Sequence, residues 1–316
     1  MAWFWSESDR PQPAPRPKPA SHGSPVGYPK LGHFNADFRG NIATITQIQP
    51  GMSTATVTRR TDLFNYRELT EAELQAYRDK GYLVINSILT PEGRRRMVEE
   101  SMAVWTAQKG VYDPSANWLK NALLPNIHHH SQVVRDYYLN GPLVDFMQQI
   151  IGPNIKGVTS QLTFKMRGHT TSFAWHQDNG YGELDPYNSV TCLTALEDND
   201  QETGCLWIIP ESQRMRQIAP GLTGAEKSAG QEVVLKADET KAVPMPMKAG
   251  DCLIFSCWML HKSGGNFSKD RDRRVLFLRY ADADAVEVYN NRKPRLGRVV
   301  RGQSSFPEVA AYEKDL

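Results

Sequence analysis

The sequence predicts a mainly β fold, an antiparallel sandwich or jelly-roll barrel, with flanking helices on its N-terminal side. Beyond about residue 155, short runs rich in β-branched and aromatic residues are divided by turn signals, and no helical pattern separates them. Between residues 68 and 151, helix start and stop signals recur instead. The expected strands are 158–165, 173–178, 189–196, 205–209, 233–235, 251–257 and 275–280.

The first 67 residues differ in composition and residue pattern from the rest of the chain. Residues 1–30 contain repeated prolines with arginine, lysine, serine and glycine, which is typical of a disordered or polyproline tail. Residues 31–67 are interpreted as an N-terminal extension. Two alternating runs between residues 42 and 58 favour a hairpin that turns at Pro50 and Gly51.

Local signals place the helices of the N-terminal layer. Thr70 followed by Glu73 is a capping box, and Gly81 ends the helix that this box opens. Pro91 stands at the first position of a second helix, where its missing N–H is not needed. Two further helices are expected, at 132–138 and 142–151.

Three adjacent histidines, His128, His129 and His130, invite interpretation as a metal cluster. Adjacent side chains in regular structure cannot all face one ion. We therefore expect a loop here, capped by Ser131 before the next helix.

The later part of the chain divides into a core domain, an insertion and a tail. Residues 68–290 are expected to form the core domain, and residues 291–316 a C-terminal tail. The polar segment 210–248, broken by Pro220 and Gly221, indicates an insertion loop. Long loops at barrel mouths often form lids or substrate walls.

Composition excludes several classes of protein. Thirty-seven Lys and Arg against 35 Asp and Glu give a net charge of +2, which indicates neither a nucleic-acid partner nor a membrane partner. No apolar run approaches the roughly 20 residues that a membrane helix needs. The four cysteines form no Cys-x-x-Cys pair, so we expect buried free thiols and a cytoplasmic location, with disulfides as the alternative.

His176, Asp178 and His261 are the candidate metal ligands. Residues i and i+2 of a strand share a face, so a strand ending near residue 178 would point an imidazole and a carboxylate the same way. His261 follows the strand-like run 252–256 and can supply a third ligand. Two histidines and one carboxylate form the facial triad of iron(II) oxygenases, which leaves open positions on the metal. A His-x-Asp triplet alone is weak evidence, because chance produces it often.

Basic residues on the neighbouring strands indicate an anion site. Arg273 and Arg279 share a face of one expected strand, and an inward arginine needs an anion. Gln161 and Lys165 share a face of another strand, and Ser263 lies two residues after His261. A solvated edge is the alternative for the arginines, and a surface position is the alternative for Lys165.

Several motifs in this order resemble the phytanoyl-CoA dioxygenase superfamily, which includes ectoine hydroxylase and many natural-product oxygenases. They are Trp-His-Gln-Asp at 175–178, Thr-Gly-Cys-Leu-Trp-Ile-Ile-Pro at 203–210, and His-Lys-Ser-Gly at 261–264, with Arg273 beyond. The resemblance covers about residues 68–284. It implies a double-stranded β-helix (jelly-roll) fold that works with iron(II), 2-oxoglutarate and dioxygen.

The resemblance also implies roles for individual residues. His176, Asp178 and His261 would hold the metal, and Arg273 would grip the distal carboxylate of 2-oxoglutarate, assisted by Ser263 and Lys165. Arg271 and Arg274 are rivals for that grip. Gln161, Arg279 and Trp207 are candidates for contact with substrate; for Arg279 and Trp207 packing is the alternative.

The function implied is oxidation of a C–H bond in a small molecule, by hydroxylation, desaturation or ring closure, with release of succinate. Related halogenases replace the carboxylate ligand by a small residue, so Asp178 disfavours halogenation. Two other classes remain open. One is a non-catalytic jelly-roll binding module with a relic metal site, and the other is a cupin-type isomerase or hydrolase.

Overall fold

The computed structural model describes residues 43–45, 57–109, 122–219 and 233–316, all within the unit Phe38–Leu316. The predicted tail at 1–30 and the turn at Pro50 and Gly51 lie outside the described residues. The two short strands of the extension, β1 (Ala43–Ile45) and β2 (Val57–Arg59), pair antiparallel as the alternation predicted.

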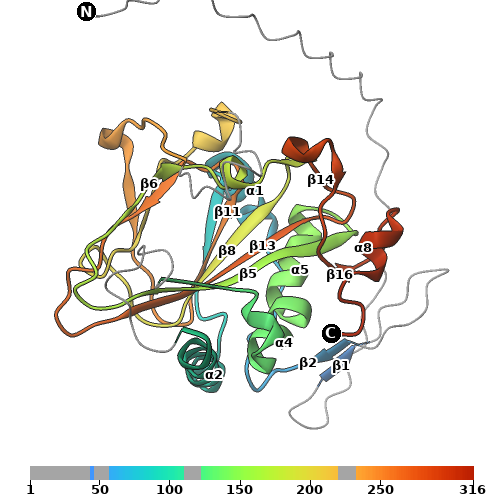
Figure 1. The fold of residues 1–316 in the computed structure, drawn as a ribbon, viewed down its shortest axis with the longest axis horizontal. Helices are drawn as coiled ribbons and strands as arrows, with labels where there is room; N and C mark the ends of the chain where they lie inside the picture. The colour runs from blue at the N-terminus through green and yellow to red at the C-terminus, as the bar shows by residue number, and fades with distance from the viewer. Residues whose placement is uncertain (1–42, 46–56, 110–121, 220–232) are drawn as a thin grey trace, which may run out of the picture. The chain divides into compact units, whose positions relative to one another are not determined.

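Two antiparallel sheets form the main body of this unit (Figure 1). The larger has the strand order β16-β5-β13-β8-β11-β3, and β4 also pairs with β5. Its strands are β3 (Tyr82–Ile85), β4 (Leu123–Pro125), β5 (Ile155–Lys165), β8 (Val190–Ala195), β11 (Cys252–Ser256), β13 (Arg273–Asp282) and β16 (Arg298–Arg301). The smaller sheet has the order β10-β9-β12-β6. Its strands are β6 (Phe173–His176), β9 (Leu206–Ile208), β10 (Val243–Met245) and β12 (His261–Ser263).

Helices flank the larger sheet, and short elements complete the unit. The α-helices are α1 (Glu71–Lys80), α2 (Pro91–Lys109), α4 (Gln132–Asn140), α5 (Pro142–Ile150), α6 (Asp178–Tyr181) and α8 (Pro307–Ala311). The 3-10 turns are η2 (Ile127–His129), η3 (Ser212–Met215), η4 (Glu239–Lys241) and η5 (Val288–Asn290). A third small sheet joins β15 (Lys293–Pro294), β14 (Val286–Glu287) and β7 (Leu184–Asp185) in that order.

Alternation along β13 gives the larger sheet two different faces. Leu276, Leu278 and Tyr280 belong to the hydrophobic core that the sheet shares with α2, α4 and α5. The alternate residues Val275, Phe277 and Arg279 line a cavity on the opposite face. This period of two is what strand geometry requires, and it separates a packing face from a face available for chemistry.

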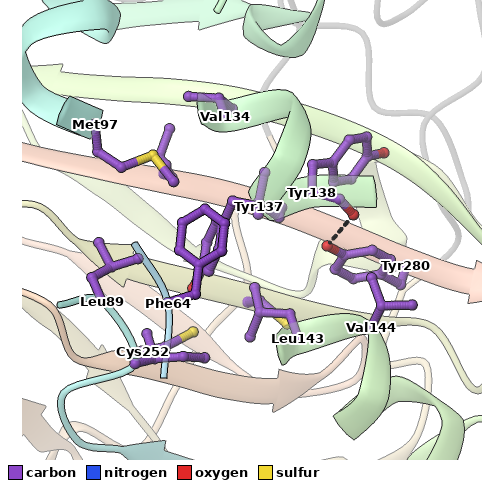
Figure 2. Close-up of a cluster of buried hydrophobic side chains, with 14 of the residues drawn as sticks. Phe64, Leu89, Met97, Val134, Tyr137, Tyr138, Leu143, Val144, Cys252 and Tyr280 are labelled. Atoms are coloured by element: carbon purple, nitrogen blue, oxygen red, sulfur yellow. Dashed lines mark hydrogen bonds between the residues drawn. The ribbon is translucent and has the colours of Figure 1, made fainter. Parts of the chain in front are cut away.

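The core between helices and sheet is close-packed and contains a few satisfied polar groups (Figure 2). The hydroxyl of Tyr280 donates a hydrogen bond of 2.8 Å to the backbone carbonyl of Tyr138. The hydroxyls of Tyr137 and Thr194 lie 2.9 Å apart, within hydrogen-bond distance. Because these buried hydroxyls have partners, the aromatic side chains add apolar area without the penalty of an unsatisfied polar group.

The predicted caps are confirmed, although the helix expected at 132–138 runs on to Asn140. Thr70 Oγ1 accepts from the Glu73 N–H, the Glu73 carboxylate accepts from the Thr70 N–H, and Gly81 closes the helix in the left-handed region with φ 82°. Ser131 caps α4 through the Val134 N–H.

Two strand predictions need correction. Residues 233–235 form no strand; the Leu235 N–H makes a single backbone hydrogen bond, of 2.7 Å, to the Trp175 carbonyl, and no ladder follows. The strand predicted at 173–178 ends at His176, and Asp178 begins the helical turn α6.

The C-terminal residues take part in the fold. β16 pairs antiparallel with β5 at the edge of the larger sheet, and α8 follows it. Among the described residues, no helix is both long and apolar enough to cross a membrane. All four cysteines are buried free thiols, as expected.

Shortening a core side chain tests this packing. Leu143 is fully buried in α5, so Leu143→Ala should lower the free energy of unfolding by about 2–5 kcal/mol, through lost burial and the cavity left behind. Leu296→Ala, at a 46% exposed position, should change it by less than about 1 kcal/mol. Denaturant unfolding of both variants measures the difference, and equal effects would contradict the described core.

Candidate metal centre

Three ligand groups from three elements converge in the described structure. His176 ends β6, Asp178 begins α6, and His261 begins β12. β12 pairs with β6 so that His261 lies directly opposite His176. Asp178 Oδ1 is 3.6 Å from His261 Nε2 and 3.9 Å from His176 Nε2. Two ligands bound to one ion at about 2 Å each can be no more than about 4 Å apart, so the three donor atoms fit a shared ion.

Both imidazoles are oriented in the same way, by a hydrogen bond to a backbone carbonyl. His176 Nδ1 is 2.7 Å from the Ala174 carbonyl, and His261 Nδ1 is 2.9 Å from the Met259 carbonyl. A carbonyl can only accept, so Nδ1 carries the proton in each ring and Nε2 keeps its lone pair. This arrangement presents the two Nε2 atoms to a metal.

The third donor is fixed by a hydroxyl. Thr191 Oγ1 donates a short hydrogen bond to Asp178 Oδ2, which leaves Oδ1 facing the imidazoles. Burial disfavours its charge, but His261, His176 and Arg279 together hold the pKa of Asp178 below its ordinary value. Burial, and then the neighbouring His261, lower the pKa of His176 to about 4. A carboxylate and two neutral imidazoles are the protonation states that metal binding needs.

Gln177, between two of the candidate ligands, anchors this stretch on its other side. Its Nε2 donates to the carbonyls of Arg216 and Trp258, both at 2.7 Å. Its Oε1 accepts from the N–H of Ile218 at 3.0 Å. The buried amide therefore ties the ligand stretch both to the start of the 210–248 segment and to the loop that precedes β12.

A cavity of about 420 Å³ opens beside the three donors. The larger sheet contributes Thr163 and Phe277 to its lining, and the smaller sheet contributes Leu206. All three donor residues reach it, so a bound ion would have coordination positions open to a second ligand.

One part of the cavity wall holds a buried cation without a counter-ion. Arg273 is 2% exposed, and among the described residues no hydrogen bond or ion pair satisfies its guanidinium. Burial lowers its pKa to about 10. Its register partner on β5 is Lys165, whose Nζ donates to Ser263 Oγ at 2.9 Å and to the Gly264 carbonyl. Burial, and next the charge of Arg273, hold the pKa of Lys165 well below its usual range.

The two rival arginines are already paired. Arg271 contacts Asp200 and Glu202, with side chains well exposed to solvent. Arg274 pairs with Glu197 and Asp272, on the opposite face of β13 from Arg273. Of the three arginines, Arg273 alone lines the cavity.

The candidate substrate residues have different positions. Gln161 lines the cavity. Arg279 also lines it, but its guanidinium donates to Asn179 Oδ1, to Ser189 Oγ at 2.8 Å and to the Gly182 carbonyl at 3.4 Å.

Trp207 requires a correction, because the structure does not place it in the cavity wall. Successive residues of β9 face opposite ways, so Leu206 lines the cavity and Trp207 packs on the other face, against the cluster around Trp175.

Several residues of the site carried no signal in the sequence. Thr191 is one strand residue among many, and only the fold brings it to Asp178. Tyr289 and Arg295 line the cavity from the segment beyond β13, where no motif marked them.

The histidine triplet gives a second group of metal-type donors. His128 and His129 lie in the 3-10 turn η2 rather than in a loop, His130 follows the turn, and the three do not gather at one point. His128 and His129 instead place their Nε2 atoms 3.1 and 2.8 Å from the two oxygens of Glu313. These contacts satisfy the donors mutually and join the C-terminal residues to the body of the unit.

Comparison with known proteins assigns the family. The sequence pattern of the family described as phytanoyl-CoA dioxygenase (PhyH) matches residues 77–275. Phytanoyl-CoA dioxygenase domain-containing protein 1 of Danio rerio is 28% identical over 261 residues, which is 66% of this chain and 88% of the relative. Methylphosphonate hydroxylase of Gimesia maris is 26% identical over 236 residues, 72% of this chain and 87% of the relative.

Solved structures agree on the fold. The non-heme α-ketoglutarate-dependent carbocyclase SnoK from nogalamycin biosynthesis superposes with a TM-score of 0.59 at 19% identity, covering 72% of this chain and 93% of SnoK. Fold and site together define a non-haem iron enzyme dependent on 2-oxoglutarate. The chain belongs to the phytanoyl-CoA dioxygenase (PhyH) family of such dioxygenases, and the resemblance found in the sequence is thereby confirmed.

Removing the candidate carboxylate ligand tests the centre. Asp178→Ala should weaken iron(II) binding by more than about a hundredfold, because loss even of a group that orients a ligand costs ten- to a hundredfold. Asp198→Ala, which removes a surface carboxylate paired with Lys248, should leave binding unchanged. Anaerobic iron(II) titration measures both variants, and tight stoichiometric binding by Asp178→Ala would refute the assigned ligand.

Proposed function

We propose that this protein oxidises a C–H bond of a small-molecule substrate, most simply by hydroxylation, with desaturation or ring closure as variants of the same chemistry. When bound, iron(II) and 2-oxoglutarate supply that oxidation from dioxygen, releasing succinate and carbon dioxide. His176, Asp178 and His261 would hold the iron. Arg273, assisted by Ser263 and Lys165, would bind the distal carboxylate of 2-oxoglutarate.

The unpaired guanidinium of Arg273 is the observation that carries this proposal. A buried, unpaired charge is costly, and it persists in a fold when a ligand of opposite charge completes it. Arginine binds a carboxylate through two parallel hydrogen bonds. A relic binding module would have no need to keep such a cation beside an intact set of metal donors.

The donor set suits iron(II). Two imidazoles and one carboxylate, without a thiolate, are the ligands of non-haem iron(II) oxygenases. The two proposed imidazole ligands lie on the smaller sheet, the proposed carboxylate ligand lies in the helical turn that follows β6, and residues of both antiparallel sheets line the cavity. This arrangement supports the narrower assignment of the fold as a double-stranded β-helix.

Cavity size and the relatives bear on the substrate. A volume of about 420 Å³ suits a small metabolite together with 2-oxoglutarate. Among the relatives are proteins named methylphosphonate hydroxylase and ectoine dioxygenase, and these names favour hydroxylation of a small polar molecule. We also propose that the working domain extends beyond residue 290, because Arg295 lines the cavity.

Replacing the proposed clamp tests the function. Arg273→Gln should keep iron(II) binding but weaken 2-oxoglutarate binding by about ten- to a hundredfold, since a hydrogen bond to a charged group is worth about 1.5–3 kcal/mol. Arg274→Gln, one residue along and on the other face, is the matched control and should bind normally. Calorimetric titration of 2-oxoglutarate into the anaerobic iron-loaded proteins measures the effect.

Turnover gives the second half of this test. Succinate release that requires iron(II) and 2-oxoglutarate, and that rises with a candidate small molecule, supports an oxygenase. Equal 2-oxoglutarate affinity in the parent, Arg273→Gln and Arg274→Gln would contradict the clamp. Absence of any binding by the folded parent would favour a non-catalytic module.

A further inference from the structure

One wall of the cavity comes from residues beyond the part of the chain that matches the family pattern, which ends at residue 275. Tyr289, at the centre of η5, and Arg295, just after β15, line the cavity there. Backbone hydrogen bonds fix this wall: the Arg295 N–H donates to the Ala285 carbonyl, and the Val288 N–H donates to the Glu183 carbonyl. The wall is therefore a built part of the site and not a loose end.

Hydrogen bonds orient the guanidinium of Arg295, which remains partly exposed. Its Nη1 donates to Glu287 Oε1 at 2.8 Å and its Nη2 to the Val158 carbonyl at 3.2 Å. Glu287, 8% exposed, is itself fixed by Asn290 Nδ2 at 2.9 Å. Nη1 and Nη2 thus have acceptors, the guanidinium also interacts with the Tyr289 hydroxyl, and the side chain remains 36% exposed beside the cavity.

The other two arginines that line the cavity, Arg279 and Arg273, have different roles. Arg279 donates through Nη1 and Nη2 to the Gly182 carbonyl, Asn179 and Ser189, and so braces the turn that carries Asp178, while its buried Nε has no partner among the described residues. Arg273 lies six residues away along β13, roughly 20 Å for an extended strand. Arg273 is the proposed site for 2-oxoglutarate. Arg279 is only 7% exposed, whereas the side chain of Arg295 is 36% exposed, so Arg295 is the arginine of the lining most open to another ligand.

The charge of the lining calls for an anion beyond 2-oxoglutarate. Three arginines and one carboxylate, Asp178, line the cavity, and iron(II) would add two positive charges. The two carboxylates of 2-oxoglutarate do not balance this excess, even with Glu287 behind Arg295. Positive charge in a confined cavity favours a ligand of opposite sign.

We propose that Arg295, oriented by Glu287 and flanked by Tyr289, anchors an anionic group of the substrate, a carboxylate or a phosphonate-type group. The inference rests on the proposed function for the role of the bound molecule and names its chemical class: a small organic acid. Its anionic end lies at the C-terminal wall, and its oxidised carbon lies toward the iron donors.

Matched ligands and variants test this anchor. The probes are a homologous series of straight-chain carboxylates, the corresponding primary amides and the corresponding alkylphosphonates. Calorimetry measures their binding to protein loaded with iron(II) and saturating 2-oxoglutarate, without dioxygen. The variants are Arg295→Gln, Arg295→Lys and the control Arg292→Gln, whose arginine is exposed and pairs with Asp185.

The parent and Arg292→Gln should bind an acid of the series about ten- to a hundredfold more tightly than its amide. Arg295→Gln should abolish this preference, and Arg295→Lys should keep part of it. Iron(II) and 2-oxoglutarate affinities should be equal in all four proteins, which also shows that the variants fold. A stronger response to carboxylates or to phosphonates identifies the anionic group.

Three results would overturn the anchor. The first is that the parent shows no preference for the acid, or binds no acid at all. The second is that the preference survives in Arg295→Gln. The third is that acid binding weakens as the 2-oxoglutarate concentration is raised, which would place the acid at Arg273 instead. Failure of the proposed function has a separate signature, namely that the parent binds no 2-oxoglutarate.

Discussion

The register between β12 and β6 is the constraint on which the site depends. It sets His261 opposite His176, and the turn of α6 then brings Asp178 to both. A slip of one residue would turn every side chain of β12 to the other face and remove His261 from the centre. The hydrogen bonds of Gln177, which join the ligand stretch to the loop before β12, hold this register from the side away from the cavity.

The larger sheet supplies the cavity wall that faces the candidate metal ligands. On β13 the residues facing the helices pack in the core, and those facing the cavity bring Arg273 to one end and Arg279 to the other. Helices α4 and α5 therefore affect the site indirectly, because their packing against one face of the larger sheet fixes the position of the strands whose other face lines the cavity. Buried cations can be kept in that wall because the surrounding strands hold them in place.

Signals within short stretches of sequence were enough to predict much of this. The capping box at Thr70 and the glycine stop at Gly81 each depend on neighbours in the chain, and the structure has them as expected. The motif around His176 was found from sequence too, but Asp178 reaches the imidazoles from the helical turn α6 and not from the strand that was expected. Which face of a strand a residue takes was harder to predict: Trp207 was a candidate for the wall with packing as the alternative, and the structure packs it while its neighbour Leu206 lines the cavity. Thr191 and Arg295 could not be found from sequence, since only long-range pairing brings them to the site.

An anaerobic crystal structure with iron(II) and 2-oxoglutarate tests the central claim most directly. The account predicts one iron within about 2 Å of His176 Nε2, Asp178 Oδ1 and His261 Nε2. It also predicts the distal carboxylate of 2-oxoglutarate on the guanidinium of Arg273. Iron bound instead at His128, His129 and Glu313, or 2-oxoglutarate held away from Arg273, would contradict it.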